Sequence, residues 1–119
     1  MTQSPMISIV DDDPWARSGL EDLIRSLGYE ARTFASAEEF VASGSIDDSF
    51  CLITDLHMPG LNGLELQDRL RQEGRRIPVI ILTAYPEEHH RKQALAGGAA
   101  CFLAKPLDEA VLVACLQSL

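Results

Sequence analysis

The stretch FCLITDLHMPG, residues 50–60, decides the fold of this chain. Its first five residues are almost all apolar, and a short apolar run bounded by a turn is typical of a strand buried on both faces. The run ends at Asp55, and a turn containing Pro59 and Gly60 follows. The sequence therefore predicts a carboxylate that is presented at the end of a buried strand and is not hidden within the core.

Three other apolar runs also end in polar residues. Residues 7–10 lead into Asp11 and Asp12, residues 79–82 into Thr83, and residues 100–104 into Lys105. The carboxyl ends of parallel strands lie along one edge of a sheet, and this edge binds ligands in open α/β sheets. We therefore expect carboxylates, a hydroxyl and an ammonium group at one site. These groups suit phosphoryl chemistry on a divalent metal ion.

Strand-like and helix-like segments alternate five times, which is typical of a parallel sheet with helices on both faces. Helix starts are expected at Asp13–Pro14, at the capping-box pattern Ser36–Glu39, and at Asp108. The expected strands cover residues 7–10, 29–34, 50–55, 78–83 and 100–104. Right-handed crossovers then predict a flavodoxin-like, doubly wound (βα)5 fold, with a five-stranded parallel sheet in the order 2-1-3-4-5.

Length and composition fit one domain over residues 1–119, long enough to bury a core. The net charge of −8 argues against direct binding to nucleic acid, which needs a basic face. No apolar stretch reaches transmembrane length, and the first residues lack the pattern of a signal peptide. We therefore expect a cytoplasmic domain that does not bind membranes.

Two groups of residues with metal-binding side chains are interpreted as structural. The three cysteines, Cys51, Cys101 and Cys115, are odd in number and have no metal-type spacing, so we interpret them as small core residues in a reducing compartment. His89 and His90 are neighbours on an expected helix and should point about 100° apart. We interpret them as part of a solvated helix face that does not share a metal ion.

Five segments resemble motifs of the receiver domain of two-component response regulators, and they occur in the family's order. These segments are Ile9–Pro14, Thr54–Gly60, Leu64–Leu66, Leu82–Ala84 and Phe102–Pro106. The resemblance covers essentially the whole chain. Residues 28–29, 36–40 and 64–66 are most similar to receivers joined to a LuxR-type helix-turn-helix output domain.

The resemblance implies a role for each site residue. Asp55 would accept a phosphoryl group from a sensor histidine kinase. A Mg²⁺ or Mn²⁺ ion would be held by Asp12, Asp55, the backbone carbonyl of His57 and, through water, Asp11. The phosphoryl-binding and switch residues would be Thr83, Ala84, Lys105 and Phe102, and the Lys105–Pro106 peptide bond would be cis.

The resemblance also implies how the signal leaves the domain. Phosphorylation would switch the face formed by the fourth helix, the fifth strand and the last helix, and this face would support a homodimer and control transcription. The domain would be a phosphoacceptor with self-phosphorylation and self-dephosphorylation chemistry, and not an enzyme in the ordinary sense. We expect it to be the N-terminal part of a longer regulator.

Two alternative functions differ from this prediction. A stand-alone receiver that acts by binding another protein fits the same residues. A phosphohydrolase of the haloacid dehalogenase type would use Asp11, Asp13, Thr83 and Lys105. The hydrolase template leaves Asp55 and its Met-Pro-Gly turn unexplained, so the sequence favours a receiver.

Overall fold

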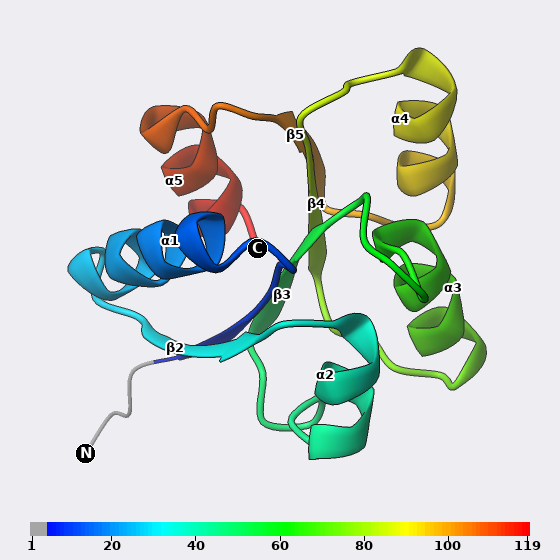
Figure 1. Ribbon diagram of the computed structural model, residues 1–119, viewed down its shortest axis with the longest axis horizontal. Helices are drawn as coiled ribbons and strands as arrows, with labels where there is room; N and C mark the ends of the chain where they lie inside the picture. The colour runs from blue at the N-terminus through cyan, green and yellow to red at the C-terminus, as the bar shows by residue number, and fades with distance from the viewer. Residues whose placement is uncertain (1–4) are drawn as a thin grey trace.

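The computed structural model describes residues 5–119, in which five strands alternate with five helices (Figure 1). The strands are β1 (Met6–Val10), β2 (Glu30–Phe34), β3 (Cys51–Asp55), β4 (Val79–Thr83) and β5 (Cys101–Ala104). The helices are α1 (Pro14–Ser26), α2 (Ala37–Ser43), α3 (Gly63–Gln72), α4 (Glu88–Ala96) and α5 (Glu109–Gln117). Within these described residues, no helix is long and apolar enough to cross a membrane.

All five strands are parallel and lie in the order β2-β1-β3-β4-β5. The predicted flavodoxin-like fold is therefore confirmed. The chain runs outward from β1 to β2 on one side of the sheet and from β3 to β5 on the other. This reversal opens a crevice at the carboxyl ends of β1 and β3, where Val10 pairs with Thr54.

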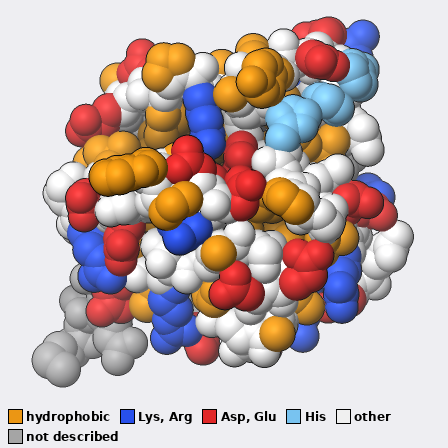
Figure 2. Space-filling model, in the orientation of Figure 1, with side chains coloured by type: hydrophobic (Ala, Val, Ile, Leu, Met, Phe, Trp, Pro, Cys, Tyr) orange, Lys and Arg blue, Asp and Glu red, His pale blue; other side chains and the backbone are white. Residues whose placement is uncertain are grey.

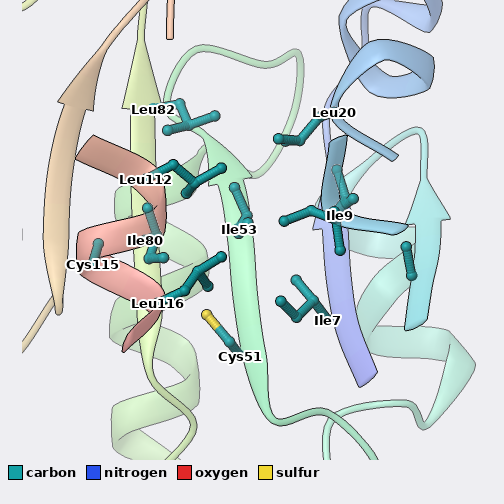
Figure 3. Packing of buried hydrophobic residues seen from close by; sticks show 12 residues of the cluster. Ile7, Ile9, Leu20, Cys51, Ile53, Ile80, Leu82, Leu112, Cys115 and Leu116 are labelled. Atoms are coloured by element: carbon teal, nitrogen blue, oxygen red, sulfur yellow. The ribbon is translucent and has the colours of Figure 1, made fainter. Parts of the chain in front are cut away.

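The helices cover both faces of the sheet, with α1 and α5 on one face and α2, α3 and α4 on the other (Figure 1). Successive strand residues alternate between the faces, so Ile53 packs toward α1 and α5 while Leu52 packs toward the other helices. Figure 3 shows Ile53 beside Leu112 and Leu116 of α5. Each fully buried side chain of this size contributes about 1.5–3 kcal/mol. Packing on the sheet therefore stabilises helices that would be too short to persist alone.

Helix starts follow the expected capping residues, with one difference. The side chains of Asp13 and Asp108 accept backbone hydrogen bonds at the starts of α1 and α5. Ser36 Oγ accepts a hydrogen bond from the Glu39 N–H, but among the described residues the Ser36 N–H donates none to the Glu39 carboxylate. The predicted capping box is therefore only half formed.

The structure corrects the interpretation of the cysteines. Cys101 of β5 and Cys115 of α5 form a disulfide, with their Cα atoms 6.6 Å apart. The prediction that all three cysteines are unpaired is therefore wrong for these two. Alternation along β5 turns Cys101 toward the face that α5 covers, so the pairing depends on how that helix packs. Cys51 remains a free, buried thiol (Figure 3), and burial raises its pKa to about 12.

Candidate functional site

Three carboxylates meet at the carboxyl ends of β1 and β3. Oxygen atoms of Asp11, Asp12 and Asp55 all lie within 4.8 Å of one another. Asp11 is buried and Asp12 is exposed, while the side chain of Asp55 is 12% exposed. Figure 2 shows acidic side chains gathered near the centre of the face in view, with a basic side chain beside them. The structure thus brings together the three acids that the sequence singled out.

Lys105 reaches this group from β5, two strands away from β3. Its Nζ donates a hydrogen bond to Asp11 Oδ2 at 3.0 Å and lies 3.5 Å from Asp55 Oδ1. The Lys105–Pro106 peptide bond, which follows the strand, is cis. Burial lowers the pKa of Lys105, but the hydrogen bond to Asp11 and the charges of both carboxylates outweigh burial and raise it. The amine therefore stays protonated at neutral pH.

The carboxyl group of Asp55 has a raised pKa. Burial raises the pKa of its carboxyl group, and the charge of Asp11 raises it further. Lys105 and the N–H of Leu56, which donates to Oδ1 at 3.1 Å, offset this only in part. Three carboxylates face one ammonium group, so negative charge is in excess. A hard divalent cation with oxygen ligands, such as Mg²⁺, fits this donor set.

The loop after Asp55 is held by residues that sequence reasoning missed. The N–H of Gly63 donates to the Leu56 carbonyl at 2.9 Å, and a Cβ atom on Gly63 would lie 2.5 Å from the Asp55 carbonyl oxygen. Only glycine therefore allows α3 to begin so close to the end of β3. Asn62 and Glu65 form a complete capping box at this helix start. The pattern Asn62-x-x-Glu65 could have revealed it, because an N-cap residue followed three positions later by Glu is the usual signal.

Two of the predicted switch residues lie beside the carboxylates, on β4 and just after it. Asp55 is paired with Leu82 in the sheet, so Thr83 is one residue further along the neighbouring strand. The side chain of Thr83 is buried, and its hydroxyl accepts a hydrogen bond from the N–H of Tyr85 at 3.0 Å. Ala84 is exposed.

Phe102, the remaining switch residue, is not part of the acidic group. It is partly buried and packs against the apolar cluster under α2, α3 and α4. Its register partner on β4 is Ile81, and Thr83 lies two positions after Ile81. Side chains two positions apart on a strand share a face, so Phe102 and Thr83 lie on the same side of the sheet.

The histidines differ from expectation. The ring nitrogens of His89 and His90 and the carboxylate of Glu87 lie within 4.8 Å of one another, which contradicts the expectation that the two histidines cannot easily share a metal ion. His89 is exposed, but only 21% of the His90 side chain is. The ring of His57, two residues after Asp55, lies 5.6 Å from the His90 ring and 6.0 Å from the Tyr85 ring between centroids.

Comparison with known sequences identifies the family. The sequence model of the response regulator receiver domain matches residues 7–117. The chain belongs to the response regulator receiver domain family. The resemblance drawn from the motifs is therefore confirmed, and a receiver domain is a signalling module in a two-component system, not an ordinary enzyme. The hydrolase template finds no support, because the Asp13 side chain caps α1.

Two curated relatives match this chain over most of its length. The transcriptional regulatory protein FixJ of Azorhizobium caulinodans is 35% identical over 118 residues, which cover 99% of this receiver domain and 56% of the relative. Nodulation protein W of Bradyrhizobium diazoefficiens is 36% identical over 108 residues, which cover 91% and 48%. This chain thus spans about half the length of the curated relatives it matches.

Solved structures of receivers superpose closely on this one. The chemotaxis protein CheY4 of Vibrio cholerae has a TM-score of 0.87 at 25% identity, and 98% of each chain is covered. The response regulator StyR has a TM-score of 0.89 at 35% identity, covering 98% of this chain and 59% of StyR. This chain therefore shares its fold with receivers at 25% and at 35% sequence identity.

Proposed function

We propose that this receiver domain takes up a phosphoryl group on Asp55 from a sensor histidine kinase. One observation carries the proposal: the Asp55 carboxylate sits at a strand end among Asp11, Asp12 and Lys105, three groups that can neutralise or hold a phosphoryl group and its metal ion. A carboxylate in this position is a competent nucleophile for phosphorus and gives an acyl phosphate.

In this proposal a Mg²⁺ ion, or Mn²⁺ in its place, binds the acidic group. Asp12 and Asp55 would ligate it directly, Asp11 through water, and the third protein ligand would be the backbone carbonyl of His57. Support comes from the three carboxylates within 4.8 Å and from the pKa of Asp55, which burial raises most and the charge of Asp11 raises further. When bound, the ion supplies charge neutralisation for the transferred oxygens.

The transfer itself needs only positioning by the chain. A carboxylate oxygen of Asp55 attacks the phosphorus of a phosphohistidine, the O–P bond forms as the N–P bond breaks, and the donor imidazole takes up a proton. The Leu56 N–H fixes the orientation of the carboxylate, and Lys105 pairs with the incoming phosphoryl oxygens. Thr83 donates its hydroxyl hydrogen to another of these oxygens, and the small Ala84 leaves them room. The same site supports slow self-phosphorylation and self-dephosphorylation.

The proposed switch runs from Thr83 to the face formed by α4, β5 and α5. The hydroxyl of Thr83 accepts a hydrogen bond from Tyr85, at the start of the loop that leads to α4. If Thr83 turns toward a phosphoryl group, this bond is lost and the loop is released. Phe102 lies on the same side of the sheet and can pack into the space that Thr83 leaves. The result is a two-state shift that the phosphoryl group biases.

The proposed output of the receiver, control of transcription, is based on the names and lengths of its relatives. We propose that residues 1–119 are the N-terminal receiver of a longer transcriptional regulator, because the transcriptional regulatory protein FixJ is about twice as long. The α4-β5-α5 face would form a homodimer on phosphorylation, and a separate LuxR-type domain would bind DNA. The receiver itself, with a net charge of −8, would bind neither nucleic acid nor membranes. The proposed location is the cytoplasm, where histidine kinases obtain ATP.

Intact-mass spectrometry tests the proposed phosphoacceptor. Incubation with Mg²⁺ and acetyl phosphate should add one phosphoryl mass to the wild type and none to Asp55→Asn. Asp13→Asn is the matched control, because Asp13 lies near the site but caps α1 with a side-chain oxygen that Asn retains. If Asp55→Asn gains a phosphoryl group with the same yield as the control, Asp55 is not the acceptor.

A further inference from the structure

A second group of metal-binding side chains lies outside the acidic site, at the start of α4. Oε2 of Glu87 lies 3.3 Å from Nε2 of His89 and 3.9 Å from Nδ1 of His90. All three donor atoms fall within 4.8 Å of one another. Figure 2 shows the histidines gathered in one strip on the surface, beside the acidic centre of the same face.

The Glu87 carboxylate does not cap α4, the helix that it precedes. Glu87 is the N-cap residue of α4, with extended backbone angles of φ −120° and ψ 139°, and its side chain makes no capping hydrogen bond. Helix N-caps favour Ser, Thr, Asp or Asn, whose short side chains reach the free N–H groups. The longer Glu side chain instead faces the two imidazoles.

His90 contributes a nitrogen atom that lacks a partner. Its Nδ1 is buried and has no hydrogen-bond partner in the part of the chain that the structure describes. The contact to Glu87 at 3.9 Å is too long for a hydrogen bond. The His57 ring meets the His90 ring edge to face, at an interplanar angle of 68°, and so helps to fix its orientation. A buried nitrogen that is held in place without a partner is a candidate ligand atom for a metal ion.

We propose that Glu87, His89 and His90 bind a divalent transition-metal ion of the zinc class. Two imidazoles and one carboxylate suit zinc, and three protein ligands leave a fourth position for water. A tetrahedral zinc ion with ligands at about 2.0–2.1 Å sets neighbouring donor atoms about 3.3 Å apart. The Glu87–His89 separation already has this value, and the Glu87–His90 separation needs to shorten by about 0.6 Å.

This site differs from the acidic site in chemistry and in effect. Mg²⁺ prefers oxygen ligands and keeps its waters, so it should favour the three aspartates over a group with two imidazoles. A zinc ion at the second site would link the residue before α4 to the first turn of that helix and hold the helix start in place. The proposal does not depend on phosphorylation of Asp55.

Calorimetric titration with zinc chloride tests the proposal, using the disulfide-bonded protein with Mg²⁺ in excess to occupy the aspartates. One zinc ion per chain should bind. Glu87→Gln, His89→Gln and His90→Gln should each weaken binding about tenfold or more, because each loses a direct ligand. Two controls should bind zinc as the wild type does. Glu88→Gln changes an acid on the same helical turn that pairs with Arg91 instead, and Asp12→Asn changes the acidic site.

Two results of the titration would overturn the proposal. One is unchanged affinity in His90→Gln, and the other is loss of zinc binding in Asp12→Asn. Circular dichroism checks that each variant is folded. Long-range ¹H–¹⁵N spectra give an independent readout in the wild type: zinc should shift Nε2 of His89 and Nδ1 of His90, the two nitrogens that face Glu87. A shift confined to the His57 ring would place the ion elsewhere and reject the site.

Discussion

Breaking the Cys101–Cys115 disulfide should lower the free energy of unfolding by about 3 kcal/mol. The bond joins the edge strand β5 to the C-terminal helix α5 across 14 residues. In the chain-entropy model, closing a loop of this length removes about 3 kcal/mol of conformational freedom from the unfolded chain. For a domain of 119 residues, this corresponds to roughly 10 °C in Tm.

The assay is urea unfolding, followed by circular dichroism, of oxidised protein and of protein reduced while unfolded and refolded with reductant. Reduction should move the midpoint down by about 1–2 M urea. Mass spectrometry after alkylation in denaturant should find one labelled cysteine in the oxidised sample and three in the reduced one. Cys51→Ala is the matched control: it keeps the bond and should show the same difference between oxidised and reduced protein. Cys101→Ala should show none.

The result that refutes the reasoning is equal stability of the oxidised and reduced wild type, with mass spectrometry confirming that the bond was broken. It would mean that the pair does not restrict the unfolded chain. Three alkylated cysteines in the untreated sample would show that the bond does not form at all.

Three further predictions concern the acidic site. First, Asp55→Asn should raise Tm in EDTA at pH 7. The folded-state pKa of Asp55 is raised, mainly by burial, so stabilisation from the protonated carboxyl is present below the unfolded pKa of about 3.9 and is lost as pH rises through the folded pKa. The gain from Asn should therefore disappear near pH 3. Second, Mg²⁺ at a hundredfold excess over its Kd should add about 2.7 kcal/mol to the unfolding free energy, and Asp12→Ala should abolish this gain while raising metal-free stability. Third, Thr83→Ala should still be phosphorylated but should no longer self-associate in sedimentation experiments with a phosphoryl mimic.

Each of these predictions has an outcome that contradicts it. An Asp55→Asn variant that melts at the wild-type temperature in EDTA at pH 7 would show that the ionised carboxylate costs no stability. If Mg²⁺ does not change the melting temperature of the wild type, the proposal of a metal site is wrong. If the mimic drives wild type and Thr83→Ala into the same oligomer, Thr83 does not transmit the signal.

Short-range patterns determined the fold and the position of Asp55. Apolar runs of four or five residues separated by helical segments specify a parallel sheet, and right-handed crossovers leave few strand orders. Because parallel strands end at one edge, the polar residues after Val10, Leu82 and Ala104 had to lie near Asp55. Each of these steps uses the local order of residues and one topological rule, so the sequence alone was enough.

Contacts between distant elements were decided only by the tertiary structure. Cys101 and Cys115 gave no pairing signal, because their pairing depends on α5 lying across the face of β5. Helical angles set His89 and His90 apart, yet their ring nitrogens lie far from the helix axis and both turn toward Glu87. The helical angle between neighbouring residues sets only the direction of their Cβ atoms. The positions of the donor atoms depend also on the side-chain rotamers and on the extended backbone of Glu87 at the helix start. Those rotamers depend on neighbours such as His57, which the fold brings in from the loop after β3.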